Sequence, residues 1–203
     1  QMIGNSDILL EPVSALLLIP GLSAIILALL PGYRLTARLN VLSTGLTFLA
    51  SLWLLVVRPE TGDYLLVDDL NIVFVVLGTF VGFTTSVFSA SYIGHELDIG
   101  RLTPANLRFY HAMYQALMFA MNLALLANNI GLMWVAVELA TLTTVLMVGI
   151  YRTHEALEAA WKYFILGSVG IALALFGTIL VYMAAQPVLG EGTASMIWTN
   201  LMT

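Results

Sequence analysis

The chain has 203 residues, of which 60% are hydrophobic and only 9% are charged, and its mean hydropathy is +0.96. Soluble domains usually hold about a quarter charged residues and just under half apolar residues. This composition therefore excludes a soluble enzyme, a nucleic-acid-binding protein and a disordered linker. The chain has no cysteine, so it holds no disulfide, no thiolate metal site and no cysteine-ligated iron–sulfur cluster.

Six apolar runs follow one another along the chain, and each is long enough to cross a bilayer core of ~30 Å as a helix. They are too long and too uniformly apolar for transmembrane β-strands of about 10 residues. The runs predict helices at about Pro12–Leu30, Leu39–Val57, Leu70–Tyr92, Phe109–Ala127, Ile130–Tyr151 and Leu157–Ala185. We expect an all-α polytopic membrane protein, with a six-helix transmembrane region over residues 1–185 and a tail on the outer side over residues 186–203.

Basic residues in the short connections predict the orientation in the membrane. Five arginines follow the first, third and fifth runs: Arg34, Arg38, Arg101, Arg108 and Arg152. The opposite connections hold one arginine, Arg58, among four acidic residues. By the positive-inside rule the N-terminus lies outside and the arginine-rich connections face the cytoplasm. No basic residue precedes the first run, so we expect no cleavable signal peptide.

One carboxylic acid, Glu138, stands about eight residues inside the fifth run, or ~12 Å deep at 1.5 Å per residue. A charge at the middle of a spanning helix costs ~2.5–3.5 kcal/mol on insertion scales, so it usually faces a protein interior or a water-filled cavity. Trp134 and Thr141 lie one turn away on the same face. Glu138 is therefore a candidate for proton transfer. The alternative is a protonated glutamic acid that bonds a neighbouring helix and only holds the bundle together.

Lys162 is a second candidate, about five residues inside the sixth run. Its aromatic neighbours Trp161 and Tyr163 suggest that it enters protein rather than lipid headgroups. A structural role stays open, because Lys162 can snorkel to the surface and Glu158 can pair with it across one turn. Ser168 and the nearby glycines allow close helix approach or local unwinding beside it.

A polar stripe follows the fourth run, where His111, Gln115 and Asn122 fall on one helical face. Polar side chains in a membrane helix often only hold helices together. The alternative is a set of water-holding groups along a proton path, with His111 as its titrating member. His95, Glu96 and Asp98 are interpreted as a solvated loop. No catalytic triad, phosphate-binding loop or metal-ligand spacing appears, so we expect no catalytic centre and no cofactor in this chain.

Two stretches carry a resemblance to a known family. Residues 133–142 (MWVAVELATL) and 157–163 (LEAAWKY) resemble the antiporter-like subunits of complex I and membrane-bound hydrogenases. Within that group the chain looks most like hydrogenase-4 component F. The likeness extends from about Asp68 to Tyr182, whereas the first two runs match only in hydropathy.

The resemblance implies a proton-translocating subunit of a bacterial inner membrane, without redox groups of its own. In that family a glutamate that matches Glu138 modulates a lysine protonated in mid-membrane, and a lysine that matches Lys162 belongs to the central hydrophilic axis. Family members carry two inverted repeats with further lysines beyond the sixth span. The chain would be their N-terminal half, either as a fragment of a longer subunit or completed by a second chain.

The expected partners are the lipid bilayer, other membrane subunits and, indirectly, peripheral iron–sulfur or nickel-bearing subunits, with no nucleic acid. In the working mechanism, two unit charges ~8 Å apart interact by about 2 kcal/mol at an effective dielectric of ~20, so anionic Glu138 raises the proton affinity of a nearby lysine. Three other functions stay open: a subunit of a multi-subunit sodium/proton antiporter, a part of an ion-coupled bicarbonate uptake system, and a non-conducting scaffold for a peripheral enzyme.

Overall fold

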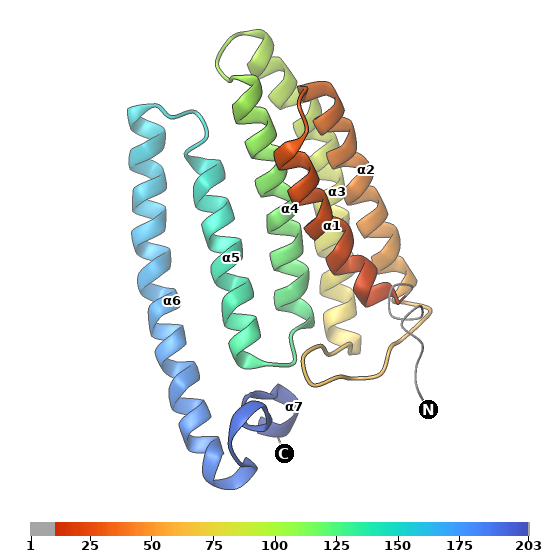
Figure 1. The fold of residues 1–203 in the computed structure, drawn as a ribbon, viewed down its shortest axis with the longest axis vertical. Coiled ribbons are helices and arrows are strands. Elements are labelled where there is room, and N and C mark those ends of the chain that lie inside the picture. Colours follow the sequence, from red (N-terminus) through yellow and green to blue (C-terminus); the bar gives the residue numbers. More distant parts are fainter. Residues whose placement is uncertain (1–10, 203) are drawn as a thin grey trace.

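The computed structural model describes residues 11–202, which form helices joined by short connections (Figure 1). The six long helices are α1 (Pro12–Leu29), α2 (Tyr33–Trp53), α3 (Asp69–Asp98), α4 (Pro104–Leu126), α5 (Ile130–Val148) and α6 (His154–Leu189). A 3-10 helix η2 (Gly192–Met196) and the short helix α7 (Trp198–Leu201) follow. The predicted all-α membrane protein is confirmed, with one long helix for each predicted run. The first ten residues, whose predicted place is outside the membrane, lie outside the described residues.

Local sequence signals determine where several helices begin. The Asp68 side chain accepts a hydrogen bond from the Asn71 N–H, and the Asn71 side chain accepts one from the Asp68 N–H. This reciprocal capping satisfies backbone donors that the first turn of α3 leaves free. Asn129 and Thr153 cap α5 and α6 with their side-chain oxygens. These three connections of the sequence therefore contain the start signals of the helices that follow them.

The interpretation of His95, Glu96 and Asp98 as a solvated loop is wrong in two respects, since the segment is helical and Glu96 is buried, although His95 and Asp98 are exposed. These residues form the last turn of α3, which continues to Asp98. The Glu96 side chain is buried, and its Oε1 lies 3.6 Å from Nη1 of Arg101. The Glu96 carbonyl also accepts hydrogen bonds from the N–H groups of Arg101 and Leu102. These contacts fold the connection back onto the helix, which a count of polar residues does not reveal.

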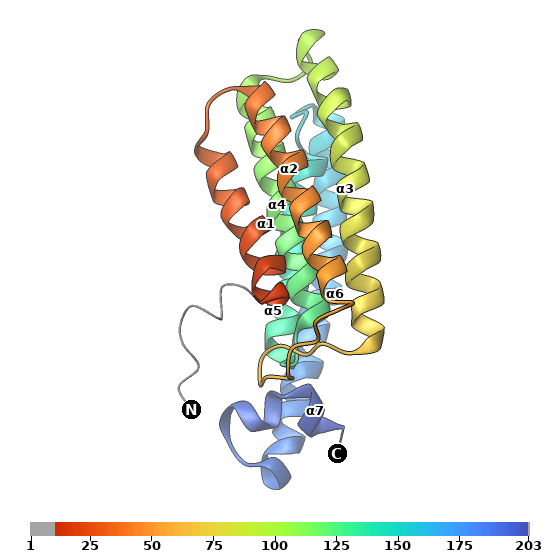
Figure 2. The ribbon, with the colours of Figure 1, turned by 90° about the vertical axis from the view of Figure 1, so that its right-hand side faces the viewer.

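Helices α1 to α4 form a bundle, and α5 and α6 extend it to one side (Figures 1 and 2). Helix α4 is central, because it contacts α1, α2, α3 and α5. Helix α6 packs along α5 at the edge of the molecule. We call the end with Arg34, Arg38, Arg101, Arg108 and Arg152 the basic end, and the end with the connection 58–69 the acidic end. Helix α7 lies beyond the α4–α5 connection at the acidic end (Figure 1).

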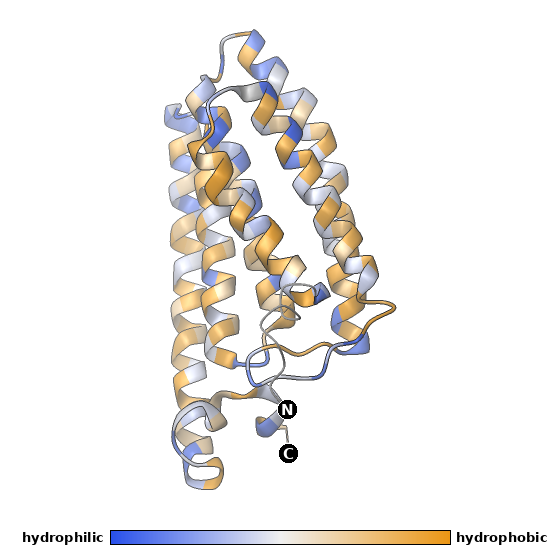
Figure 3. Ribbon diagram, turned by 45° about the vertical axis from the view of Figure 1, so that its right-hand side comes forward, coloured by the Kyte–Doolittle hydropathy of each residue, from blue (hydrophilic) through white to orange (hydrophobic). Residues whose placement is uncertain are grey.

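Four of the described helices are long and apolar enough to cross a membrane by composition alone, namely α1, α3, α5 and α6. Helices α2 and α4 have 21 and 23 residues, which is also spanning length. Their hydropathy is lower because each carries a polar stripe that it buries within the bundle. Hydrophobic residues recur along most of the length of the helices (Figure 3).

The interior of the α1–α4 bundle is apolar at its two ends and polar between them. The cluster at the acidic end consists of Val13, Leu16, Ala50, Leu54, Ile72, Val75 and Leu126. The cluster at the basic end consists of Ile93, Leu102, Leu107 and Ile150. Between them lies what we call the polar band, formed by Ser23, Asn40, Ser43, Thr44, Ser86, His111 and Gln115. A soluble bundle would place apolar side chains at this level.

Hydrogen bonds within the polar band connect all four helices of the bundle. Gln115 Nε2 on α4 donates to Asn40 Oδ1 on α2 at 2.8 Å. The Ser43 hydroxyl on α2 lies 2.7 Å from that of Ser23 on α1 and 3.1 Å from Gln115 Oε1. The Thr44 hydroxyl contacts the Ser86 hydroxyl of α3 at 2.6 Å. Lipid tails are as apolar as leucine, so such bonds and close packing hold membrane helices together in place of the hydrophobic effect.

Replacement of Gln115 should therefore weaken the bundle. Gln115→Leu leaves the buried Asn40 Oδ1 without its partner, and we expect the free energy of unfolding to fall by about 1–3 kcal/mol. The measurement is thermal unfolding of the purified chain in detergent, followed by circular dichroism. Met121→Leu is the matched control, because this α4 side chain is 38% exposed and lies outside the band. Equal stability of the two variants would contradict a structural role for the band.

Candidate functional site

The Glu138 carboxylate lies on the face of α5 that carries Trp134 and Thr141. Its Oε2 atom is buried and has no hydrogen-bond partner within residues 11–202. A buried polar atom without a partner usually costs about 1–3 kcal/mol, and more when it is charged. The described helices therefore do not use this atom of Glu138 to hold α5 in place.

The polar neighbours expected for Glu138 bond to other groups. The indole Nε1 of Trp134 donates to the Ile171 carbonyl of α6 at 2.9 Å. The Thr141 hydroxyl donates to the Val137 carbonyl at 3.1 Å. Thr141 also packs closely on α6, because a Cβ at Gly167 would lie 3.2 Å from its methyl group. The Trp134 bond and the packing of Thr141 on Gly167 join α5 to α6, and neither involves the Glu138 carboxylate.

Lys162 is 71% exposed, and its Nζ lies 2.5 Å from Oε1 of Glu158. The ion pair across one helical turn is therefore formed. Trp134 of α5 contacts Ile171 of α6, and Thr141 of α5 contacts Gly167 of α6. Glu138 lies between these two contacts and is therefore level with Val169, about seven residues from Lys162. That separation is ~10 Å along the helix axis. The structure does not bring the two charged groups together.

The middle of α6 packs closely on α5 and is not unwound. The helix is continuous from His154 to Leu189. The Ser168 hydroxyl donates to the Phe164 carbonyl one turn earlier at 2.6 Å. Ser168 therefore satisfies its own hydrogen-bonding needs within α6 and offers no donor to Lys162 or Glu138.

The polar stripe of α4 points into the α1–α4 bundle. Gln115 and Asn122 bond across helices, the latter from Nδ2 to the Leu16 carbonyl at 3.1 Å. His111 differs, since it is 0% exposed and neither ring nitrogen has a hydrogen-bond partner in the described part of the chain. It lies ~10 Å along α4 from Pro104, between the basic end and Gln115. Gln115 and Asn122 thus hold helices together, whereas His111 has a polar ring with no structural bond.

Sequence reasoning missed the α2 side of the polar band. Asn40 Oδ1 accepts the hydrogen bond of Gln115, while Asn40 Nδ2 is buried without a partner. Residues Asn40, Thr44, Thr47 and Ser51 recur every three or four positions along α2 and are all buried. That spacing is the signal of a single helical face. This spacing is present in the sequence, but the apolar residues between the four polar ones make the segment resemble a uniformly apolar run.

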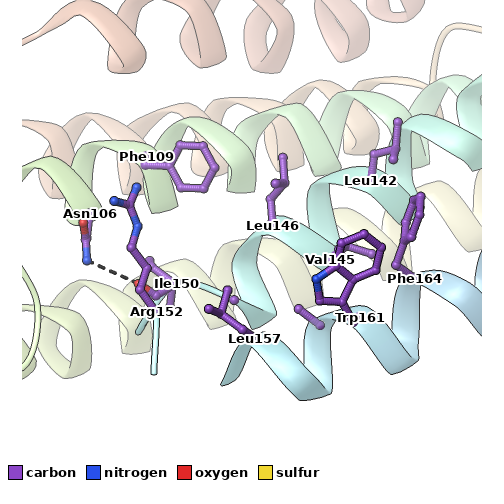
Figure 4. A pocket seen from close by; sticks show the side chains of 12 residues that line it. Asn106, Phe109, Leu142, Val145, Leu146, Ile150, Arg152, Leu157, Trp161 and Phe164 are labelled. Carbon is purple, nitrogen blue, oxygen red and sulfur yellow. Dashed lines mark hydrogen bonds between the residues drawn. The ribbon is translucent and has the colours of Figure 1, made fainter. Parts of the chain in front are cut away.

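An apolar groove of about 590 Å³ runs between α4, α5 and α6 towards the basic end. Figure 4 shows Phe109 of α4, Leu142 and Leu146 of α5, and Phe164 of α6 along its walls. Leu142 is one turn from Glu138 on the same helical face, but Glu138 itself does not line the groove. The groove thus extends from the level of Leu142 and Phe164 to the basic end of the molecule.

Because Glu138 Oε2 makes no hydrogen bond that holds the fold, its neutralisation should not destabilise the chain. We expect Glu138→Gln to unfold at the same temperature as the unmodified chain or higher, since it removes a partly buried carboxylate. Thermal unfolding in detergent measures this. Trp134→Phe is the comparison, and it should lower stability by about 1 kcal/mol because the bond to Ile171 is lost. A large loss of stability in Glu138→Gln would instead support the purely structural interpretation.

Comparisons with known proteins show which proteins this chain is similar to. A family model described as "NADH:quinone oxidoreductase/Mrp antiporter, TM" matches residues 127–196, which include α5, α6, Glu138 and Lys162. The hydrogenase-4 component F homolog of Methylacidiphilum infernorum is 59% identical over 190 residues, or 94% of this chain and 40% of that protein. NADH-quinone oxidoreductase subunit N 2 of Thermodesulfovibrio yellowstonii is 27% identical over 176 residues, or 82% and 37% of the two chains. NADH-quinone oxidoreductase subunit N 1 of Opitutus terrae is 39% identical over 90 residues, which are 43% of this chain and 18% of that protein.

The chain belongs to the antiporter-like membrane subunits of the complex I and membrane-bound hydrogenase superfamily. Its similarity to a hydrogenase-4 component F homolog extends over most of its length. The chain spans 40% and 37% of the first two of these relatives. His111 lies outside the segment that the family model matches, whereas Glu138 lies inside it.

Proposed function

We propose that the chain is a proton-translocating subunit of a respiratory redox complex of the hydrogenase or NADH dehydrogenase type. The observation that carries the proposal is the Glu138 carboxylate, which lies deep in α5 with a buried oxygen that no described group satisfies. A charge kept at an energetic disadvantage inside a membrane helix is typical of a proton relay. The segment matched by the family model contains this residue.

In the proposed orientation the basic end faces the cytoplasm of a bacterial inner membrane and the N-terminus lies outside. All five arginines of that end support it through the positive-inside rule. The proposed partners are other membrane subunits and, indirectly, iron–sulfur or nickel-bearing peripheral subunits. The redox reaction takes place in those partners, and this chain supplies part of the proton path.

The proposed mechanism is electrostatic coupling between Glu138 and a basic group. At ~10 Å and an effective dielectric of ~20, anionic Glu138 favours protonated Lys162 by less than about 2 kcal/mol, and Glu158 already neutralises that lysine. The stronger partner of Glu138 is therefore a basic group supplied from outside the described helices. Loss or gain of charge on Glu138 changes the proton affinity of that group and drives its proton onward.

His111 is proposed as a separate proton-holding group in the polar band. Its ring is buried without partners beside Gln115 and Asn40, and Asn40 Nδ2 also lacks one. Buried polar groups without a protein partner are commonly satisfied by bound water, which makes two to four hydrogen bonds to such groups. An imidazole ring can accept a proton at one nitrogen and donate one from the other. Together these groups form a hydrated position between the basic end and the centre of the bundle.

Glu138→Gln should reduce proton transport without loss of assembly. Removal of a coupling of about 1.4–2 kcal/mol changes the proton affinity of its partner by roughly tenfold or more. We expect a decrease of that order in redox-driven acidification of inverted membrane vesicles that contain the whole complex. Glu155→Gln, an exposed first-turn residue of α6, is the control and should transport normally. Wild-type transport and coupled turnover in Glu138→Gln would refute the charge mechanism.

His111→Leu should also reduce transport, but without the loss of stability expected for Gln115→Leu, since no hydrogen bond of His111 is removed. The two variants therefore separate transport from folding within the same band. Transport is measured in the same vesicles and stability in detergent. If the histidine only fills space, His111→Leu will transport like the unmodified chain. Wild-type transport in both the Glu138 and the His111 variants would favour a non-conducting scaffold.

A second candidate is a subunit of a sodium/proton antiporter, because the matching family model also describes Mrp antiporters. The two candidates differ in the ion that the assembly needs. Transport by a redox-driven proton pump proceeds without sodium, whereas antiport stops when sodium is removed. Ion replacement in the vesicle assay therefore decides between them.

A further inference from the structure

A second depression, of about 460 Å³, lies at the basic end, away from Glu138 and the polar band. It is formed by the end of α1, the beginning of α4 and the α5–α6 connection. Its lining includes Ala28, Thr103, Asn106, Arg108, Phe109 and Arg152. The depression therefore combines two cationic side chains and two polar side chains with an apolar floor, at the level where a membrane helix leaves the hydrocarbon.

The two arginines of the depression have no carboxylate partner among residues 11–202. By contrast, Arg58 pairs with Asp69, and Arg101 pairs with Glu96. Two cations that share one small depression repel each other unless an anion binds between them. Guanidinium groups bind phosphate through paired hydrogen bonds, which a lysine does not reproduce.

The α5–α6 connection is held in place over α4. Asn106 Nδ2 donates to the Ile150 carbonyl at 3.2 Å, and Asn106 Oδ1 accepts a hydrogen bond from Thr103 at 3.0 Å. Arg152 has a φ of 53°, a left-handed conformation that is unfavourable for a residue with a side chain. Figure 4 shows its guanidinium beside Asn106 and Phe109. Such conformations persist where surrounding contacts enforce them, often at ligand sites.

The depression is continuous with the apolar groove, because Asn106, Phe109 and Arg152 line both. From Ile150 to Leu142 the groove follows α5 for eight residues, or ~12 Å. Its walls are apolar side chains throughout that distance. A ligand with a phosphate and a hydrocarbon chain would satisfy the arginines and the groove at the same time.

We propose that this depression binds the phosphate of an anionic phospholipid between Arg108 and Arg152, with one acyl chain in the groove beside Phe109. Anionic lipids are attracted to basic residues at the membrane surface, and here the two arginines are positioned around one cavity. Asn106 holds the connection that carries Arg152 through its bond to the Ile150 carbonyl, and Thr103 orients Asn106. The inference needs only the membrane location of the chain and is independent of proton transport.

Native mass spectrometry of the full chain, purified in detergent with its co-purifying subunits, tests the site. The probes are dioleoylphosphatidylglycerol and dioleoylphosphatidylcholine, which share acyl chains and differ in net charge. We expect preferential retention of the anionic lipid, and about fivefold weaker retention in Arg108→Gln and in Arg152→Gln. Arg152→Lys keeps the charge but loses the paired hydrogen bonds, so its retention of the anionic lipid should lie between that of the unmodified chain and that of Arg152→Gln. Arg38→Gln is the matched control, an exposed arginine of the same end that lies outside the depression.

Several results would overturn the proposal. Equal retention of the two lipids, or an equal loss in Arg38→Gln, would show general attraction to the surface instead of a site. Displacement by soluble glycerol phosphate at the same concentration as the lipid would show that the acyl chain contributes nothing. A benzophenone side chain introduced at Phe109 should crosslink to lipid; capture of polypeptide would assign the groove to a protein segment. Unchanged circular dichroism spectra confirm that each arginine variant is folded.

Discussion

The hydrogen bonds of Gln115 to Asn40 and Ser43 are the constraint on which the α1–α4 bundle depends. In lipid the outer surface of a helix gains nothing by leaving its apolar surroundings, so helices need interior contacts that lipid does not offer. Polar side chains supply them when each donor finds an acceptor on another helix. Within the polar band the bonds among Gln115, Asn40 Oδ1 and Ser43 meet this condition, and apolar clusters close both ends of the bundle.

Against this background, the buried groups without partners stand out. Glu138 and His111 each bury a polar atom that no described residue satisfies. They lie in different parts of the molecule, one on the face of α5 that continues into the groove and the other inside the bundle. Structural bonds thus surround both groups but do not use them. That is the arrangement expected of groups that exchange protons or ligands, because a group committed to a structural bond is not free to change its charge.

Helix α6 shows how incomplete the packing is on one side. Of its residues only Ala160 is buried, and its contacts to the long helices run mainly along α5. The hydrophobic side chains of its other faces meet lipid or other protein in the membrane. The bond from Trp134 and the close approach at Gly167 keep α6 in register with α5. The fold therefore combines a self-contained bundle with a two-helix extension that presents Glu138, Lys162 and the groove.

The sequence by itself determined the class of protein, the number of long helices and the position of most connections, because hydropathy and capping residues act over short distances. It also identified Glu138 as anomalous, since a charge inside an apolar run is visible without coordinates. Only the tertiary structure decided which polar groups are satisfied. The separation of Lys162 from Glu138, the pairing of Gln115 with Asn40 and the isolation of His111 all depend on the register and rotation of neighbouring helices. Register and rotation arise from packing between segments far apart in the chain, so they cannot be predicted from the hydropathy of a single apolar run.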